Sequence, residues 1–423
     1  MHRPATVSLR RPAGPTLGRV PAFWLLAVIL GLLLFASSAP SPLYIVYAAQ
    51  FHFSSITLTS VFAVYALGLL ASLVIAGSVS DHVGRRPTLL VALAIETAGM
   101  LLFAEAQGVG WLFAARGLQG IATGIAMGAI SAALLDLQPP ANPRLGALVG
   151  VAAPLGGLAA GALGAGLLVQ YGPNPTRLIF WLLFAVFAVA IIVATAIPET
   201  VDRAGRPWAH ALRPSVAVPG SMRVAFIATI PCLLASWALG GLILSLGPSL
   251  TAGVLGSTSH VAGGLPIFIM TGLSALASIW LRDTHARSTA RGGLAALIAG
   301  VALALIGLEA GSLALFLLGT AAAGLGFGPA FAGAFRSLAG RAPVDQRAAL
   351  VSAILVVSYL AFSLPAVAAG AAITQLGLHE TADIYGIALI VIAAVALALS
   401  GQLEDPQTEA ATARRRDALA ATA

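Results

Sequence analysis

The chain has 423 residues, of which 59% are hydrophobic and only 9% are charged. An average soluble domain carries about 25% charged residues, so this composition excludes a protein whose whole surface faces water. All 22 basic residues are arginine, and the absence of lysine excludes a P-loop and a lysine Schiff base. The net charge of +7 comes from arginines that cluster between apolar runs, which indicates membrane topology and predicts no nucleic-acid partner.

Apolar runs of about 20 residues recur along the chain, which is the length that an α-helix needs to cross a bilayer. They lack the short alternating pattern of barrel strands. We therefore predict an all-α polytopic membrane protein in which twelve transmembrane helices form two pseudo-symmetric six-helix bundles. The predicted spans are residues 22–47, 58–79, 88–105, 111–135, 145–169, 177–197, 223–247, 260–281, 292–309, 311–335, 347–373 and 382–401.

A connector rich in proline and arginine, residues 198–222, separates the first six spans from the last six. The sequence thus predicts an N-terminal bundle (22–197), a C-terminal bundle (223–401) and cytoplasmic tails at 1–21 and 402–423. With the N-terminus inside, 20 of the 22 arginines fall on the cytoplasmic side, as the positive-inside rule requires. We predict a bacterial inner (plasma) membrane protein with both termini in the cytoplasm.

The two groups of six spans resemble each other in sequence. Glu105 to Gly120 reads EAQGVGWLFAARGLQG, and Glu309 to Gly324 reads EAGSLALFLLGTAAAG. Both segments place an acid at the predicted outer end of one span and a glycine in the next span. Two repeated halves are typical of secondary transporters, whose substrate path lies between the halves.

Three motifs carry a resemblance to a known family. The stretch GSVSDHVGRRP at 77–87 resembles the loop 2–3 signature of the major facilitator superfamily, and RGLQG at 116–120 resembles its helix-4 motif. GVAAPLGG at 150–157 resembles the helix-5 motif of the antiporters in that family, except that Ala153-Pro154 replaces their usual Gly-Pro pair. The matching residues are Gly77, Asp81, Gly84, Arg85 and Arg86 in the loop, Arg116, Gln119 and Gly120 in helix 4, and Gly150, Pro154, Gly156 and Gly157 in helix 5. The chain is thus similar to bacterial drug:proton antiporters of this superfamily.

The loop motif is interpreted as a conformational latch. Asp81 falls at the predicted C-terminal end of helix 2, where the helix dipole disfavours an anion. The resemblance implies that it meets the N-terminus of helix 11, near Pro343–Arg347, and that Arg85 pairs with Asp136 at the inner end of helix 4. The alternative is that Arg85 and Arg86 only anchor the topology.

Two ionisable residues lie inside predicted spans. Arg116 lies several residues inside helix 4, where an arginine costs about 2.5–3.5 kcal/mol on insertion scales. The resemblance implies that it faces the cavity and assists proton or substrate binding, and the alternative is that it snorkels to the outer interface. Glu96 is an acid near the middle of helix 3. It is either a functional carboxylate or a protonated acid bonded to a neighbouring helix.

Polar and aromatic residues of several helices are candidates for the wall of a substrate cavity. In helix 1, Pro40 and Pro42 interrupt backbone hydrogen bonding, and freed carbonyls are tolerated in a membrane mainly beside a cavity or a partner. Each residue alone is equally compatible with an ordinary contact between helices. The candidates are Ser37, Ser38, Ser41, Tyr44, Tyr65, Gln119, Thr123, Ser236, Trp237 and Tyr359.

These features together favour a secondary transporter that works by alternating access and is not an enzyme. We expect no cofactor and no metal site, a proton gradient as the energy source, and a monomer in the lipid bilayer that carries a small-molecule substrate. Proton-coupled efflux of small, mostly apolar compounds fits the aromatic, polar-poor cavity candidates. The alternatives are a metabolite importer or facilitator of the same fold, and a membrane receptor that binds its ligand without moving it.

Overall fold

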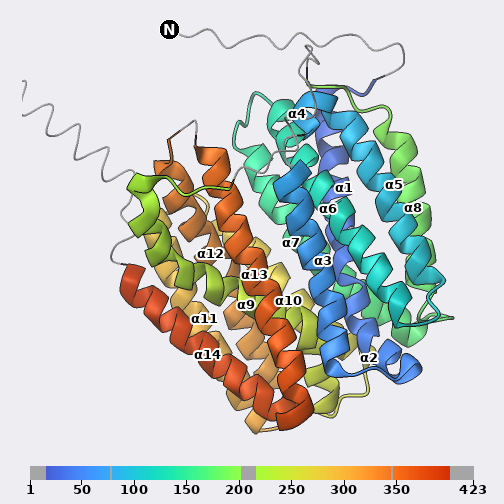
Figure 1. The fold of residues 1–423 in the computed structure, drawn as a ribbon, viewed down its shortest axis with the longest axis vertical. Coiled ribbons are helices and arrows are strands. Elements are labelled where there is room, and N and C mark those ends of the chain that lie inside the picture. The colour runs from blue at the N-terminus through green and yellow to red at the C-terminus, as the bar shows by residue number, and fades with distance from the viewer. Residues whose placement is uncertain (1–15, 77–78, 202–215, 344–345, 401–423) are drawn as a thin grey trace, which may run out of the picture. The chain divides into compact units, whose positions relative to one another are not determined.

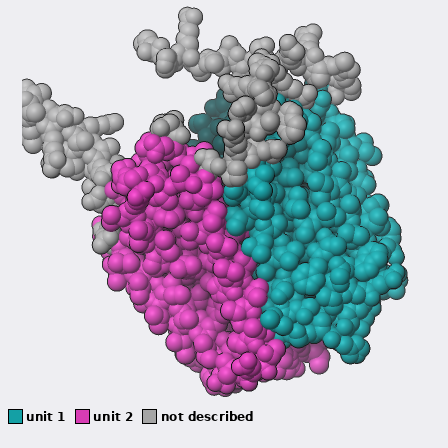
Figure 2. Space-filling model, viewed as in Figure 1, with its two compact units in different colours: residues 1–214 teal, residues 215–423 magenta. Residues whose placement is uncertain are grey.

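The structure of the protein is a computed structural model that describes residues 16–76, 79–201, 216–343 and 346–400. The chain divides into two compact units, residues 1–214 (unit 1) and 215–423 (unit 2), which are coloured separately in Figure 2. The described residues form helices and no strand, so the predicted all-α fold is confirmed. Residues 1–15 of the predicted N-terminal tail, most of the connector and the whole predicted C-terminal tail lie outside the described residues, and α1 begins at Arg19, inside the predicted N-terminal tail.

Unit 1 contains six membrane-length segments and one short helix, which follow one another from blue to green in Figure 1. The helices are α1 (Arg19–Ser38), α2 (Pro40–Phe51), α3 (Ser55–Ala76), α4 (Val79–Val83), α5 (Arg85–Ala104), α6 (Val109–Leu137), α7 (Leu145–Tyr171) and α8 (Leu178–Ala194).

Unit 2 contains six long helices, preceded by the single 3₁₀ turn η2 (Gly220–Met222). The helices are α9 (Arg223–Gly253), α10 (His260–Trp280), α11 (Ala286–Glu309), α12 (Leu313–Arg341), α13 (Arg347–Leu376) and α14 (Leu378–Leu399).

Eleven of these segments are long and apolar enough to cross a membrane. The twelfth, α8, has 17 residues, which is the short end of the range of about 17–25 residues found for spanning helices. Pro198 follows α8 closely and cannot continue a helix. We therefore count α8 as the twelfth span, in agreement with the sequence-based prediction.

The helix boundaries differ from the prediction in three places. The first span is interrupted at Ala39, between α1 and α2, yet Ala39 keeps helical angles (φ −53°, ψ −39°) and the segment runs on for 33 residues. The predicted seventh span ended at residue 247, whereas α9 continues through Pro248 to Gly253. The short helix α4 was not predicted, and it places Asp81 in a helix of its own.

The two units repeat the same pattern of helix packing. When α1, α3, α5, α6, α7 and α8 are matched in order with α9 to α14, each principal pair in unit 1 has a counterpart in unit 2. These pairs are α3–α6 with α10–α12, α5–α6 with α11–α12, α1–α7 with α9–α13, α5–α8 with α11–α14, and α1–α6 with α9–α12. The weak sequence repeat therefore reflects a structural repeat.

Glycine allows the same close helix crossing in both units. A Cβ added to Gly120 of α6 would lie 2.3 Å from the carbonyl oxygen of Tyr65 in α3. A Cβ added to its counterpart Gly324 of α12 would lie 2.6 Å from the carbonyl oxygen of Met270 in α10. Both distances are far below van der Waals contact, so each position requires glycine. Small residues that bring helix backbones together are a main source of helix association in membranes.

The helix-5 motif residues have different environments although they are adjacent. A Cβ on Gly157 would lie 2.1 Å from the carbonyl oxygen of Gly31 in α1, whereas a Cβ on Gly156 or Gly150 would meet nothing within 4 Å. Pro154 lies inside α7 without ending it. Gly157 therefore joins α7 to α1, and Gly156 and Gly150 make no such contact.

We predict opposite effects for alanine at these neighbouring glycines. Gly156→Ala should stabilise the protein by up to about 1 kcal/mol, because alanine has the higher helix propensity. Gly157→Ala should destabilise it by about 1–3 kcal/mol, the usual cost of overpacking. Thermal unfolding in detergent measures both variants, and shifts of the same sign would contradict the packing described for α1 and α7.

Candidate functional site

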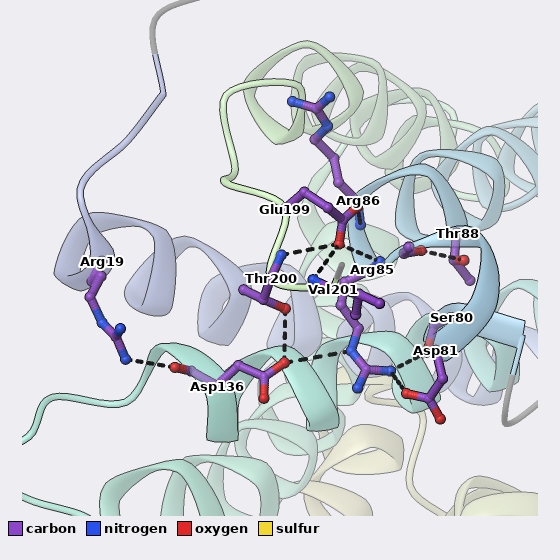
Figure 3. A network of polar contacts seen from close by, with 11 residues as sticks. Arg19, Ser80, Asp81, Arg85, Arg86, Thr88, Asp136, Glu199, Thr200 and Val201 are labelled. Atoms are coloured by element: carbon purple, nitrogen blue, oxygen red, sulfur yellow. Dashed lines mark hydrogen bonds and ion pairs between the residues drawn. The ribbon is translucent and has the colours of Figure 1, made fainter. Parts of the chain in front are cut away.

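The N-terminus of α5 is capped by a carboxylate from a distant part of the chain (Figure 3). Gly84, which precedes α5, has φ 112° and provides no side-chain cap. Glu199, which follows α8, takes that role: Oε1 accepts a hydrogen bond from the backbone N–H of Arg85 at 2.8 Å, and Oε2 from that of Arg86 at 3.2 Å. The first N–H groups of a helix lack intrahelical partners and carry the positive end of its dipole. A carboxylate at this position therefore satisfies both the hydrogen bonds and the charge.

The Arg85 side chain points toward two acids (Figure 3). Its Nη1 lies 2.5 Å from Asp81 Oδ1 and donates to Ser80 Oγ at 2.6 Å. Its Nε lies 3.6 Å from Oδ2 of Asp136, near the end of α6. Thr200 Oγ1 donates to the same Oδ2 at 2.8 Å. The pairing of Arg85 with Asp136 that the family resemblance implies is thus present within unit 1.

Two further contacts extend this cluster to other helices. Arg86 Nη1 donates to the carbonyl oxygen of Thr195 at the end of α8, at 3.2 Å. Arg19 Nη2, from the first residue of α1, donates to the carbonyl oxygen of Asp136 at 2.7 Å. Side chains therefore connect α1, α4, α5, α6 and α8 at one end of unit 1. We call this cluster the loop network; its members are Arg19, Ser80, Asp81, Arg85, Arg86, Asp136, Glu199 and Thr200.

Solvent exposure and the number of hydrogen bonds indicate which contact contributes most to the loop network. The Asp81 side chain is 52% exposed, and ion pairs in solvent contribute only about 0–1 kcal/mol. Glu199 accepts hydrogen bonds from the backbone N–H groups of Arg85, Arg86, Thr200 and Val201. Bonds to an ionised acceptor are roughly twice as strong as neutral ones. Glu199 therefore contributes more than the ion pair between Arg85 and Asp81.

The capping role of Glu199 was not predicted from the sequence, although a signal for it exists. The segment that opens α5 has glycine before Arg85 and no Ser, Thr, Asp or Asn in the capping position, so its first N–H groups need an acceptor from elsewhere. Glu199, in the Pro-Glu-Thr segment at 198–200, is such an acceptor. The sequence does not reveal which helix end lies beside it.

Two parts of the predicted latch stay predictions. Gly77 lies outside the described residues. So do Val344 and Asp345, within the stretch that was expected to receive Asp81.

A second cluster of polar side chains lies in the interior of unit 1, around Arg116. This residue is fully buried, so its side chain does not snorkel to the surface. Its Nε donates to the Tyr44 hydroxyl at 2.6 Å, and its Nη1 donates to the carbonyl oxygen of Ser37 at 2.8 Å and to Gln119 Oε1 at 2.6 Å. The guanidinium carbon lies 5.5 Å and 5.0 Å from the ring centroids of Tyr44 and Tyr65, within the range of cation–π attraction.

The proline that interrupts the first span explains one hydrogen bond of this cluster. In an α-helix the carbonyl of Ala36 accepts the N–H of residue 40, but residue 40 is proline and has none. Gln119 Nε2 donates to the Ala36 carbonyl oxygen instead, at 2.9 Å. The helix-4 motif therefore supplies the hydrogen bond that Pro40 removes from α1.

Glu96 of α5 belongs to the same cluster. It is fully buried, and its Oε1 accepts from Gln119 Nε2 at 3.3 Å. Its Oε2 and the Nη2 of Arg116 have no hydrogen-bond partner among the described residues. Glu96 thus bonds a neighbouring helix through the residue that also bonds Arg116, and a functional role for its carboxylate stays a prediction. We call this cluster the buried network; its members are Ser37, Tyr44, Tyr65, Glu96, Arg116 and Gln119.

The other cavity candidates occupy contacts between or within helices. Ser38 Oγ donates to a carbonyl of α7 at 2.7 Å. Thr123 and Ser236 each donate to a carbonyl of their own helix, and Ser41 is buried with no partner for its hydroxyl among the described residues. All four side chains are buried. The expected cavity between the two halves stays a prediction.

Trp237 and Tyr359 form an aromatic cluster in unit 2. The centroid of the Trp237 ring lies 4.7 Å from Tyr359, 5.4 Å from Phe331 and 5.9 Å from Phe362, in edge-to-face arrangements. Such pairs are favoured by the ring quadrupoles. The indole Nε1 is buried and has no hydrogen-bond partner among the described residues, so it is a free donor beside aromatic surface.

Comparisons with known proteins agree with this fold. The family model described as Major Facilitator Superfamily matches residues 25–364. A solved structure of a POT family transporter in complex with a thioalcohol-conjugated peptide has a TM-score of 0.72 at 15% identity, and the match covers 91% of this chain and 96% of that one. The nucleoside transporter NupG gives a TM-score of 0.67 at 13% identity, covering 90% and 98%. No curated protein matches the sequence.

At these identities the solved structures establish the fold alone. The family model covers most of the chain, from α1 into α13. The motifs that suggested the family also lie together in unit 1, at the start of α5, in α6 and in α7. The chain therefore belongs to the Major Facilitator Superfamily.

Proposed function

We propose that this membrane transporter exports small, mostly apolar compounds in exchange for protons, by alternating access. The observation that carries the proposal is the buried network, in which a carboxylate and a guanidinium share one amide side chain deep in unit 1. Ionisable residues inside a membrane are costly and mark ion or substrate pathways. A fully buried acid linked to a buried cation is suited to bind and release a proton.

The contacts of Gln119 suggest how a proton on Glu96 acts on the helices. Its amide nitrogen bonds both Glu96 and the Ala36 carbonyl, and its oxygen bonds Arg116. Protonation removes the charge of Glu96 and converts it from an acceptor into a donor as well. The change weakens its attraction to Arg116 and alters the bonds that hold the interrupted span α1–α2. Glu96 is thus proposed as the proton carrier and Arg116 as the residue that senses its charge.

The substrate class is inferred from the side chains available to bind it. The aromatic cluster around Trp237 offers apolar surface and one free N–H donor, which suits a hydrophobic compound with a hydrogen-bond acceptor. One proton that crosses 100 mV supplies about 2.3 kcal/mol, which is enough for roughly a 50-fold concentration ratio. A proton gradient alone is therefore an adequate energy source.

The loop network is proposed to hold the cytoplasmic side closed in one state of the cycle. It fixes the α4–α5 turn against α1, α6 and α8 within unit 1. A rigid turn can present Asp81 to a partner in a defined geometry, whereas a loose turn cannot. Glu199 is the residue that makes the turn rigid, because it caps α5.

Transport in proteoliposomes tests the proposed function. Compounds are first selected by the increase that they cause in the thermal stability of the purified protein. An imposed pH gradient should then drive the selected compounds against their concentration gradient, and a protonophore should abolish this accumulation. Absence of flux for every compound that binds would contradict a transporter, and flux that ignores the pH gradient would contradict proton coupling.

We predict that Glu96→Gln abolishes coupling to the proton gradient but leaves substrate exchange across the membrane intact. Glutamine cannot ionise but keeps the size and the hydrogen bonding of the acid, so pH-driven accumulation should be lost while exchange of labelled for unlabelled substrate continues. Glu105→Gln is the matched control, because Glu105 lies at the end of α5, outside the buried network. Loss of exchange in Glu96→Gln, or full coupling in it, would contradict the assignment.

We predict that Glu199→Gln loosens the start of α5. Loss of a helix cap costs about 1 kcal/mol, so amide hydrogen exchange in the first turn of α5 should become about fivefold faster. Asp283→Asn is the control. Asp283 and its ion-pair partner Arg282 are both exposed, so this variant should leave amide exchange in the first turn of α5 unchanged.

Spin-label distances across the cytoplasmic side should shift toward the open state in Glu199→Gln. Faster exchange without a shift in distances would show that the cap is structural only and would contradict the latch.

A further inference from the structure

Three ligand-type side chains meet at one end of unit 2. Glu309 is the last residue of α11, and His379 and Asp383 lie one turn apart at the start of α14. His379 Nε2 lies 3.6 Å from Glu309 Oε1 and 3.7 Å from Asp383 Oδ2. The ligand atoms of the three residues all lie within 4.8 Å of one another. Two helices therefore bring one imidazole and two carboxylates to a single point.

Two buried polar atoms of this cluster have no hydrogen-bond partner among the described residues. They are His379 Nε2 and Asp383 Oδ1. Separations of 3.6 Å and 3.7 Å are too long for hydrogen bonds. Unpartnered buried polar atoms carry a free-energy cost, and this cost disappears when the atoms bind a cation.

The spacing fits a small divalent cation. Zinc binds histidine nitrogen and carboxylate oxygen at about 2.0–2.2 Å, so two ligands of a tetrahedral site lie about 3.3–3.6 Å apart. The two separations from His379 Nε2 need little adjustment to reach this range. The i,i+4 spacing of His379 and Asp383 places both side chains on the same face of α14.

We propose that Glu309, His379 and Asp383 form a binding site for a divalent transition-metal ion of the zinc class. Three protein ligands leave one position for water. The side chains are partly exposed, with 67% of Glu309 and 44% of His379 accessible, so an ion reaches the site from solution. A bound ion connects the end of α11 to the start of α14 and thereby fixes two helices of unit 2.

The structural repeat shows that packing alone does not require these residues. Glu105 is the counterpart of Glu309 in unit 1, and α8 is the counterpart of α14. The first turns of α8 read LIFWLLF and contain no titratable residue. The same pair of helices thus packs in unit 1 without a histidine or an acid at the start of the second helix. His379 and Asp383 are additions specific to unit 2.

Metal binding to the full-length, tag-free protein in detergent tests the proposal. Zn²⁺ is titrated in competition with a chromophoric chelator, and Co²⁺ is titrated while its visible absorption is recorded. We expect one tight Zn²⁺ per chain, a rise in the thermal unfolding temperature, and a Co²⁺ spectrum typical of low coordination number. His379→Ala, Glu309→Gln and Asp383→Asn should each weaken binding by about tenfold or more, since loss of even an outer-shell partner costs 10–100-fold.

Two variants are matched controls. Glu380→Gln removes the exposed acid next to His379, and Glu105→Gln removes the counterpart of Glu309; both should bind zinc as the unchanged protein does. Glu309 is largely exposed, so Glu309→Gln tests the site without risk to folding. Absence of saturable 1:1 binding, or equal weakening in the controls, would overturn the proposal and leave only an ion pair that forms when His379 is protonated.

Discussion

The missing N–H of Pro40 is the constraint from which the chemistry of unit 1 follows. In hydrocarbon an unsatisfied backbone group costs several kcal/mol, and no water is present to replace the lost bond. Gln119 bonds the Ala36 carbonyl that Pro40 leaves free, and this fixes the orientation of its amide. The amide oxygen then faces Arg116. A defect in one helix and a buried cation in another are thus stabilised by the same side chain.

The same physical principle explains the loop network at the end of unit 1. There the unsatisfied groups are N–H donors at the start of α5, and the residue before them is Gly84, which has no side chain to offer. Glu199 provides an acceptor with the charge that the helix dipole favours. In both networks backbone groups lack a partner within their own helix, at a proline in one case and at a helix start in the other, and a side chain from elsewhere in unit 1 provides the bond. Such bonds can be exchanged more readily than those within a continuous helix.

The sequence was sufficient to predict the fold because hydrophobic length specifies a membrane helix directly. The family resemblance was also sufficient to pair Arg85 with Asp136, whereas the ion pair between Asp81 and Arg85 was not predicted. The sequence could not identify Glu199, because a capping residue far along the chain is known only once the packing of α8 on α5 is known. For the same reason, the bond between Glu96 and Gln119 required the structure. The prolines of the first span indicated its interruption, but α4 was not predicted, because hydropathy does not register a local change of backbone.

The two units share their helix packing but differ in the polar residues that they carry. The difference is seen when equivalent positions of the repeat are compared. Gly120 and Gly324 make the same close contact, so the scaffold is retained in both units. Arg116 and Gln119 of α6 correspond to Thr320 and Ala323 of α12, and Thr320 only bonds a carbonyl of its own helix. Without the arginine, unit 2 has no counterpart of the buried network at these positions. Its interior carries aromatic surface around Trp237 instead. Under the proposed exchange of protons for apolar compounds, the buried network places proton chemistry in unit 1, and the aromatic cluster around Trp237 places apolar recognition in unit 2.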